Sequence, residues 1–335
     1  MNTRVVQSSQ PARASATMQS MRLNAPGHFL MTQTPQPEPG AGQVRIRIEG
    51  CGVCASSLPL WQGRDWFKYP RKPGAPGHEA WGFVDAFGEG VHPDLELGDR
   101  VAALSYHGFA EYDIADADSV VKLPHVLDGE PFPGEALACA MNAFARSDIQ
   151  SGQTVAIVGI GFLGAVLTQL AAGAGAEVVA VSRRQFALDI ARECGAAHAV
   201  PLQDVGSTAA AVNRCLGRDG CARVIEAAGI QHTLDVASEL TAVHGRLIVA
   251  GYHQDGMRSV DMQKWNWRGI DVVNAHERDP AQYVRGMRQA VDAVISGRIR
   301  PARLYTVING LDGLERAFSL MEQRPDGFIK AVVNI

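Results

Sequence analysis

The feature that most constrains the fold is the segment from residue 153 to residue 175, QTVAIVGIGFLGAVLTQLAAGAG. A short apolar run leads into Gly159, Gly161 and Gly164, and apolar residues then recur at helical spacing. A strand, a glycine turn and a helix in this order are typical of a dinucleotide-binding unit. Gly159 permits the tight turn, Gly161 lets the backbone approach a pyrophosphate, and Gly164 allows the helix to pack close to the strand.

The helix of this segment is expected to begin at Phe162 and Leu163. The first N–H groups of a helix have no partner within it, so they can donate hydrogen bonds to phosphate oxygens. The glycine motif alone is weak evidence, and a purely structural turn is the alternative. Its place between a strand and a helix favours nucleotide binding.

The patterns on either side of this segment divide the chain into regions. Residues 21–139 contain short strand patterns separated by glycine- and proline-rich loops, which predicts a β-rich antiparallel domain. Residues 140–274 alternate six short apolar strands with helices, which predicts an α/β fold with a doubly wound parallel sheet. That sheet is complete by residue 274, so residues 275–335 are expected to return to the first domain.

Composition and charge exclude several classes of protein. The 335 residues carry a net charge of −4, so no basic field favours nucleic acid, and no apolar run approaches the ~20 residues that span a membrane. The six cysteines are too sparse for a disulfide scaffold, which favours a reducing cytoplasm. Residues 1–20 are polar and lack acidic side chains, and we expect a disordered N-terminal extension there.

The β-rich region carries candidate metal ligands. Cys51 and Cys54 form a Cys-x-x-Cys pair, and His78 and Glu79 follow in a Gly-His-Glu-Ala segment. The setting does not fit a thioredoxin-type motif, and a zinc ribbon would need a second cysteine pair. One thiolate with a distant imidazole and a carboxylate would instead form an open, three-ligand zinc site of the catalytic kind.

Five motifs in order resemble one known family: GCGVCASS, PGHEAWGFVDAFGEGV, LGDRV, GEALACAMNAF and VGIGFLG. They are similar to the zinc-dependent medium-chain dehydrogenase/reductase superfamily, which includes alcohol, sorbitol and threonine dehydrogenases. The similarity covers residues 22–335. It implies a GroES-like catalytic domain, a Rossmann cofactor domain and a homodimer or homotetramer.

The resemblance also implies the roles of individual residues. Cys54, His78 and Glu135 match the ligands of a catalytic zinc, and Glu79 matches the carboxylate beside the metal. Ser56 matches the hydroxyl that accepts or returns the substrate proton. The four-cysteine lobe that holds a structural zinc in this family has no counterpart, so we expect at most one zinc ion per chain.

Two residues depart from the family pattern. Ser57 stands where the family commonly has an aspartate that orients the ligand histidine, and Pro59 stands at the position of a proton-relay histidine. Because carboxylates around a metal ligand tune metal affinity, Ser57 predicts weaker zinc binding. Because Pro59 cannot carry a proton, proton exit would run from Ser56 through the ribose hydroxyl to water.

The end of the second strand of the Rossmann domain indicates which cofactor binds. An NAD site has an acidic residue there for the adenosine ribose, whereas this chain has Ser182, Arg183 and Arg184. Hydroxyl and guanidinium groups suit a 2′-phosphate, so NADP(H) is predicted, with NAD(H) or a solvated helix start as the alternatives. Lys330 matches a family position that contacts the cofactor phosphates.

These features predict hydride transfer between NADP(H) and a small alcohol or carbonyl compound, with zinc on the substrate oxygen. The candidate substrates are secondary alcohols, polyols, ketones and aldehydes. Two alternatives remain open. One is a reductase of the same superfamily that acts on an enone or a specialised substrate with weak or absent zinc. The other is a non-catalytic NADPH-binding protein.

Overall fold

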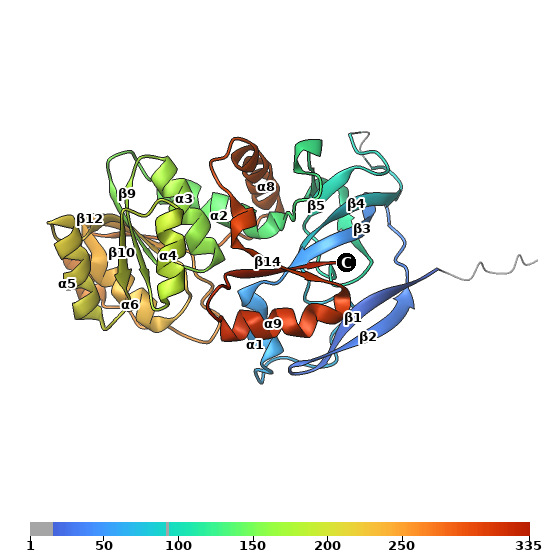
Figure 1. The fold of residues 1–335 in the computed structure, drawn as a ribbon, viewed down its shortest axis with the longest axis horizontal. Helices are drawn as coiled ribbons and strands as arrows, with labels where there is room; N and C mark the ends of the chain where they lie inside the picture. Colours follow the sequence, from blue (N-terminus) through green and yellow to red (C-terminus); the bar gives the residue numbers. More distant parts are fainter. Residues whose placement is uncertain (1–15, 92–93) are drawn as a thin grey trace, which may run out of the picture.

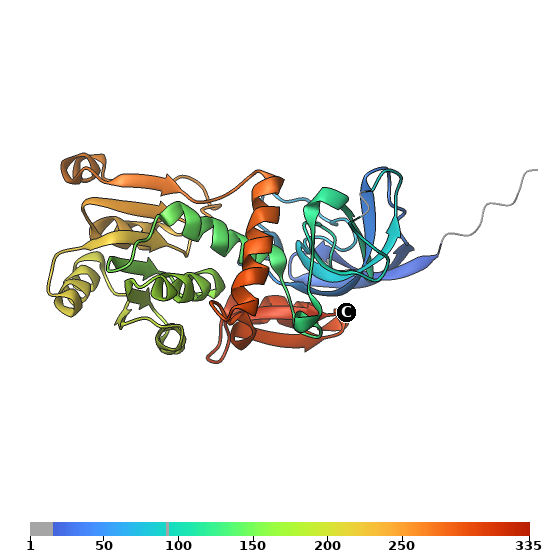
Figure 2. The same cartoon turned by 90° about the horizontal axis from the view of Figure 1, so that it is seen from above.

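The computed structural model describes residues 16–335 except 92–93. Two large sheets lie side by side along the length of the molecule, with helices α2 (Gly134–Ser147) and α8 (Pro280–Ile295) between them (Figures 1 and 2). One sheet is parallel and the other is mainly antiparallel. The predicted α/β fold class is therefore confirmed.

The parallel sheet contains six strands in the order β10-β9-β8-β11-β12-β13. One of its two central strands is β8 (Thr154–Val158), in which every residue is buried. The other strands are β9 (Glu177–Ser182), β10 (His198–Pro201), β11 (Cys221–Glu226), β12 (Thr241–Val249) and β13 (Asp271–Asn274). The connecting helices are α3 (Phe162–Gly173), α4 (Gln185–Glu193), α5 (Val205–Leu216) and α6 (Gln231–Leu240). The predicted alternation of strand and helix is confirmed.

The second sheet combines strands from the N-terminal part of the chain with two strands from its C-terminal part. Its order is β14-β15-β3-β4-β5-β7, and β6 pairs with β3. The strands are β3 (Gln43–Gly52), β4 (Glu79–Phe87), β5 (Arg100–Ala103), β6 (Tyr112–Asp116), β7 (Val120–Lys122), β14 (Tyr305–Asn309) and β15 (Lys330–Asn334). Because β15 pairs with β3, the C-terminal segment lies beside the candidate metal ligands. We propose residues 21–139 and 275–335 as the catalytic domain and residues 140–274 as the dinucleotide-binding domain.

The N-terminal part of the catalytic domain is a hairpin of β1 (Thr17–Ala25) and β2 (His28–Pro35). The prediction of a disordered extension through residue 20 is therefore wrong for residues 17–20, and residues 1–15 lie outside the described residues. The apolar alternation typical of a strand is broken in β1, because a polar residue occupies a core position. Ser20 is fully buried and its hydroxyl contacts the Thr32 hydroxyl at 3.0 Å and the Thr34 hydroxyl at 3.2 Å.

Aromatic packing joins this hairpin to two helices, α1 (Leu58–Trp61) and α9 (Leu314–Gln323). The Phe318 ring lies 5.1 Å from Trp61 and 5.4 Å from Phe29, measured between ring centroids. Such pairs add about 0.5–1.5 kcal/mol beyond the area that they bury. The segment just after Cys54 is therefore fixed against the C-terminal helix.

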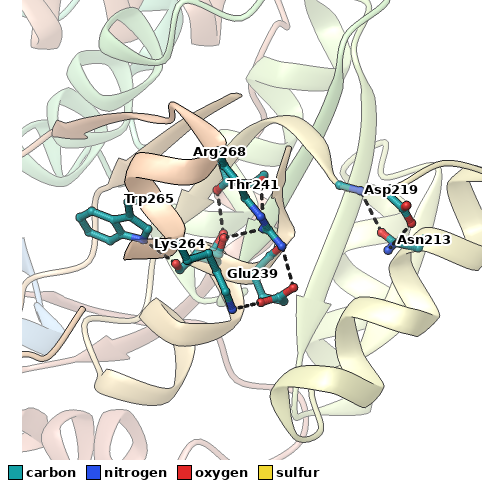
Figure 3. Close-up of polar contacts among 10 residues, drawn as sticks. Asn213, Asp219, Glu239, Thr241, Lys264, Trp265 and Arg268 are labelled. Atoms are coloured by element: carbon teal, nitrogen blue, oxygen red, sulfur yellow. Dashed lines mark hydrogen bonds and ion pairs between the residues drawn. The ribbon is translucent and has the colours of Figure 1, made fainter. Parts of the chain in front are cut away.

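Polar contacts fix α7 (Met262–Arg268) against the end of α6 and the start of β12 (Figure 3). The Arg268 guanidinium donates to the carbonyls of Glu239 at 2.7 Å and Thr241 at 3.1 Å, and it pairs with the Glu239 carboxylate at 2.9 Å. Lys264 binds the other Glu239 oxygen, and the Trp265 indole donates to the Ser238 hydroxyl at 2.6 Å. Among the helices of the described residues, none is long and apolar enough to cross a membrane.

Candidate functional site

Strand pairing brings three candidate metal ligands together. Gly52 at the end of β3 is the pairing partner of Glu79 at the start of β4. Cys54 follows β3 closely and His78 precedes β4, so both side chains come to the same end of the sheet. The Cys54 sulfur, a ring nitrogen of His78 and a carboxylate oxygen of Glu79 lie within 4.8 Å of one another. We call Cys54, His78 and Glu79 the ligand cluster.

A backbone group orients His78. Its Nδ1 atom donates a hydrogen bond to the Pro76 carbonyl at 2.8 Å, which leaves Nε2 as the nitrogen available to a metal. A partner on the second ring nitrogen is typical of histidine ligands, whether it is a carboxylate or a carbonyl. Ser57 stands where the family resemblance implies an aspartate that orients this histidine. The Pro76 carbonyl orients the ring instead.

The ligand cluster is partly buried, with Cys54 and His78 half-buried and Glu79 buried. Burial disfavours the charged form of His78, but hydrogen bonding to Cys54 and the charges of Cys54, Glu135 and Glu79 raise its pKa to about 10. Surroundings that favour the positively charged form of the imidazole also favour a bound cation. Sulfur, nitrogen and oxygen donors together are the set that zinc accepts.

Glu135, the predicted third ligand, lies close to the ligand cluster but outside it. It stands in the first turn of α2, and its Oε1 atom accepts a hydrogen bond from the Cys139 thiol at 3.3 Å. Burial raises the pKa of Glu135, and the charge of His78 opposes that rise. Glu79 is therefore the carboxylate that lies within 4.8 Å of the Cys54 and His78 donors, and Glu135 stays a predicted ligand.

Lys330 neutralises Glu79. Its Nζ atom lies 2.6 Å and 2.9 Å from the two Glu79 carboxylate oxygens and donates to the Val53 carbonyl at 3.2 Å. Both side chains are almost completely buried, at 3% and 1% exposed. Burial disfavours the ammonium, but the charges of Glu79 and Cys54 raise the pKa of Lys330. The nearest charged partner of Lys330 is thus at the ligand cluster, and its predicted contact with phosphate stays a prediction.

The ligand cluster is linked to the glycine motif through one aromatic ring. The Lys330 ammonium lies 4.9 Å from the centroid of the Phe162 ring, a cation–π contact. Phe162 is the first residue of α3, and its ring stacks on Tyr305 at 5.8 Å. The helix that would bind a pyrophosphate therefore begins beside the candidate metal site.

The glycine turn has the geometry that a dinucleotide needs. Gly159 has a φ of 106°, and a Cβ at Gly164 would collide with the Gly159 carbonyl oxygen. A Cβ at Gly161 would meet no atom within 4 Å, so the space in front of the turn is open. No side chain caps the N-terminus of α3, so none competes there for the N–H groups of the first helical turn, which begins at Phe162 and Leu163.

At the end of β9, Ser182 is buried, Arg183 is exposed and Arg184 is half-buried. The Ser182 hydroxyl accepts a long hydrogen bond from the Arg184 amide, at 3.4 Å. The Arg184 guanidinium donates to the carbonyls of Phe328 at 2.9 Å and Arg324 at 3.3 Å. Arg184 is therefore partly engaged by the C-terminal segment, whereas the Arg183 side chain has no partner among the described residues.

Ser56 lies beside the ligand cluster. Its hydroxyl donates to the Cys54 sulfur at 3.1 Å, and the residue is half-buried. A hydroxyl in this place can exchange a proton with a substrate oxygen held near Cys54. Pro59, at the relay position, is buried and offers no proton donor or acceptor on its side chain.

Sequence reasoning missed a second buried carboxylate, Glu226, at the end of β11. It accepts hydrogen bonds from the Ala228 and Gly229 amides and the Thr233 hydroxyl, and His253 contacts it at 2.9 Å. Burial raises its pKa, but these hydrogen bonds, led by that from His253, lower it further. Ala228 lies against Gly159, so this network fixes a loop beside the glycine turn. A lone glutamate at a strand end gave no pattern that could have revealed it.

Two family models match the chain. The model described as zinc-binding dehydrogenase matches residues 163–296, and the alcohol dehydrogenase GroES-like domain matches residues 40–125. A sorbitol dehydrogenase from Halalkalibacterium halodurans is 26% identical over 84% of this chain and 90% of its own length. An alcohol dehydrogenase from Geobacillus stearothermophilus is 34% identical, over 49% of this chain and 57% of its own length.

Solved structures agree with these matches. A candidate zinc-binding dehydrogenase from Sinorhizobium meliloti, bound to NADP, is 26% identical with a TM-score of 0.81 and covers 96% of this chain and 100% of its own. The chain belongs to the zinc-dependent medium-chain dehydrogenase/reductase superfamily. Within that superfamily it is an oxidoreductase of the alcohol and polyol dehydrogenase type, with a site for a nicotinamide cofactor.

Proposed function

We propose that the protein is a zinc-dependent oxidoreductase that transfers a hydride between NADP(H) and an alcohol or carbonyl substrate. The observation that carries this proposal is the contact between the ligand cluster and the start of the glycine helix. Lys330 binds Glu79 and lies over Phe162, so the metal donors and the cofactor turn are neighbours. A reaction between a metal-held oxygen compound and a nicotinamide needs this proximity.

Cys54, His78 and Glu135 would hold the zinc ion, with Glu79 beside it. When bound, zinc supplies a Lewis acid for the substrate oxygen and the nicotinamide supplies or accepts the hydride. Ser56 accepts or returns the substrate proton from its place beside Cys54. Lys330 holds the Glu79 carboxylate in place, and the Pro76 carbonyl leaves the Nε2 atom of His78 available to a metal.

Glu135→Gln is expected to lower the zinc content of the purified protein, because an amide is a poorer zinc ligand than a carboxylate. Zinc per chain, measured by mass spectrometry after dialysis, checks this. Glu193→Gln, at an exposed glutamate on α4, is the matched control. Full zinc in Glu135→Gln together with loss of zinc in Glu79→Gln would make Glu79 the third ligand.

NADP(H) is the cofactor that the end of β9 supports, because a hydroxyl and guanidinium groups occur where an NAD site carries an acid. Ser182→Asp combined with Arg183→Ala should reduce the kcat/KM ratio of NADP over NAD by about 100-fold, since charge-assisted hydrogen bonds contribute about 1.5–3 kcal/mol each. Steady-state kinetics with both cofactors measure this. Arg218→Ala, at an exposed arginine, is the control, and an unchanged ratio in the double variant would contradict the assignment.

The substrate class is a secondary alcohol, a polyol or the corresponding carbonyl compound. The relatives support this range, since they include a sorbitol dehydrogenase and alcohol dehydrogenases. A screen of alcohols with NADP and of carbonyl compounds with NADPH tests the proposal directly. Turnover of enones alone, unaffected by a zinc chelator, would favour a zinc-independent reductase. Tight NADPH binding without any turnover would favour a non-catalytic protein.

We also propose a homodimer or homotetramer in the cytoplasm. Strand β13 is an edge of the parallel sheet, and Val272 on this strand is 42% exposed. Trp267 on α7 is 90% exposed and Met257 is 99% exposed, and exposed apolar surface is typical of protein–protein interfaces where it forms a patch. The free state of all six cysteines fits a reducing compartment. Light scattering that shows a stable monomer would contradict the oligomer.

A further inference from the structure

The segment that follows α9 belongs to the catalytic domain, and it contacts the start of α4 in the dinucleotide-binding domain. Arg184 donates hydrogen bonds to the carbonyls of Arg324 and Phe328, at 3.3 Å and 2.9 Å, and Arg324 is 140 residues further along the chain. Figure 1 shows the end of α9 on the side of the catalytic domain that faces α4. A residue of the catalytic domain is thus held next to the predicted 2′-phosphate contacts.

Arg324 ends α9 in a left-handed conformation, with a φ of 47°. Its Nε atom donates to the Met321 carbonyl at 3.3 Å, which fixes the direction of the guanidinium. Its two terminal nitrogens have no hydrogen bond or ion pair with any residue that the structure describes. The Arg183 guanidinium also has no partner among the described residues. Two cations without an ion-pair partner therefore lie near the contact between Arg184 and Arg324.

The charges act on one another. Partial desolvation and the charge of Arg183 lower the pKa of Arg324, and partial desolvation and the charge of Arg324 lower that of Arg184. Asp326 acts in the opposite direction on Arg184, but it forms no ion pair with any of the three arginines in the described part of the chain. Holding guanidinium groups together without a counter-ion is unfavourable, and a bound dianion with several acceptor oxygens would reverse that cost.

We infer that Arg324 binds the 2′-phosphate of NADP(H) together with Ser182 and Arg183. Arg184 contributes through its carbonyl contacts, which hold the 324–328 segment against the start of α4. This inference rests on the proposed NADP(H) preference and deepens it, because specificity then depends on a residue outside the dinucleotide-binding domain. The phosphate would then contact residues of both domains.

Binding of cofactor fragments to the full-length protein tests the inference without any turnover. In isothermal titration calorimetry, Arg324→Gln should weaken 2′,5′-ADP by about 10- to 100-fold, as expected for a lost charge-assisted hydrogen bond, and should leave 5′-AMP unchanged. Arg324→Lys keeps the charge without the planar fork and should fall between the two. Arg316→Gln, at an exposed arginine on the same helix, is the matched control and should bind like the wild type.

The possible outcomes separate the inference from the proposed function. If the wild-type protein binds 2′,5′-ADP no better than 5′-AMP, the NADP(H) preference fails and the inference fails with it. If the wild type prefers 2′,5′-ADP and Arg324→Gln keeps that preference, only the inference is overturned. Equal weakening of both fragments, or a lower thermal midpoint, would show a structural role for Arg324 and would also overturn it.

Discussion

His78→Ala is expected to deplete the protein of zinc and to lower kcat/KM by about 10³-fold or more. Lewis-acid stabilisation by a metal contributes several kcal/mol, and each 1.36 kcal/mol corresponds to a factor of ten in rate. His78 supplies the only nitrogen of the ligand cluster, and the Pro76 carbonyl holds its ring in place. Alanine would also leave Cys54 and Glu79 without the imidazole that their charges stabilise.

Zinc content and steady-state kinetics on the same preparations measure this effect. His125→Ala is the matched control, because His125 lies on the surface with a fully exposed side chain and should change neither quantity. NADPH binding, followed by its fluorescence, should be retained in His78→Ala, because the glycine turn and Arg183 are untouched. Stoichiometric zinc and unchanged turnover in His78→Ala would show that the ligand cluster does not hold the catalytic metal.

Lys330→Met is expected to destabilise the protein by about 3–5 kcal/mol, the cost of leaving one member of a buried ion pair without its partner. Methionine fills a similar volume, so the change removes the charge with little loss of packing. Glu79 would then be an unpaired carboxylate that is 1% exposed and close to Cys54. Thermal unfolding of the zinc-loaded protein should show a clearly lower midpoint.

The double variant Lys330→Met with Glu79→Gln distinguishes charge from packing. Because it removes both charges, it should recover most of the lost stability, and the double-mutant cycle gives the coupling between the two side chains. Lys122→Met is the control, since Lys122 pairs with Asp99 at 2.8 Å with half of its side chain exposed, and it should change little. Equal midpoints for the single and double variants would contradict the account of a buried pair.

The fold was predictable because its signals are local. The strands of the parallel sheet are short apolar runs, and the glycine turn encodes its own backbone geometry at Gly159. Residues 17–20 were assigned wrongly because Ser20 fills a core position and makes hydrogen bonds within the β1–β2 hairpin, so that the apolar alternation is broken. Local patterns predict a strand well only when its buried positions carry apolar residues and its exposed positions carry polar ones.

The candidate site was predictable in part. Cys54 and His78 carry ligand chemistry in their side chains, and the β3–β4 register brings them together. The orienting group of His78 is the Pro76 carbonyl, and no sequence pattern marks a backbone carbonyl for that role. Arg324 meets Arg184 only through the return of the C-terminal segment, a contact between distant parts of the chain that no local pattern encodes.

The most direct test of the account is zinc-dependent turnover with NADP(H). The full-length protein should contain about one zinc ion per chain. Removal of that ion with a chelator should abolish NADPH-linked reduction of carbonyl substrates and NADP-linked oxidation of alcohols, and added zinc should restore both. Full turnover by protein that contains no zinc would contradict the central claim.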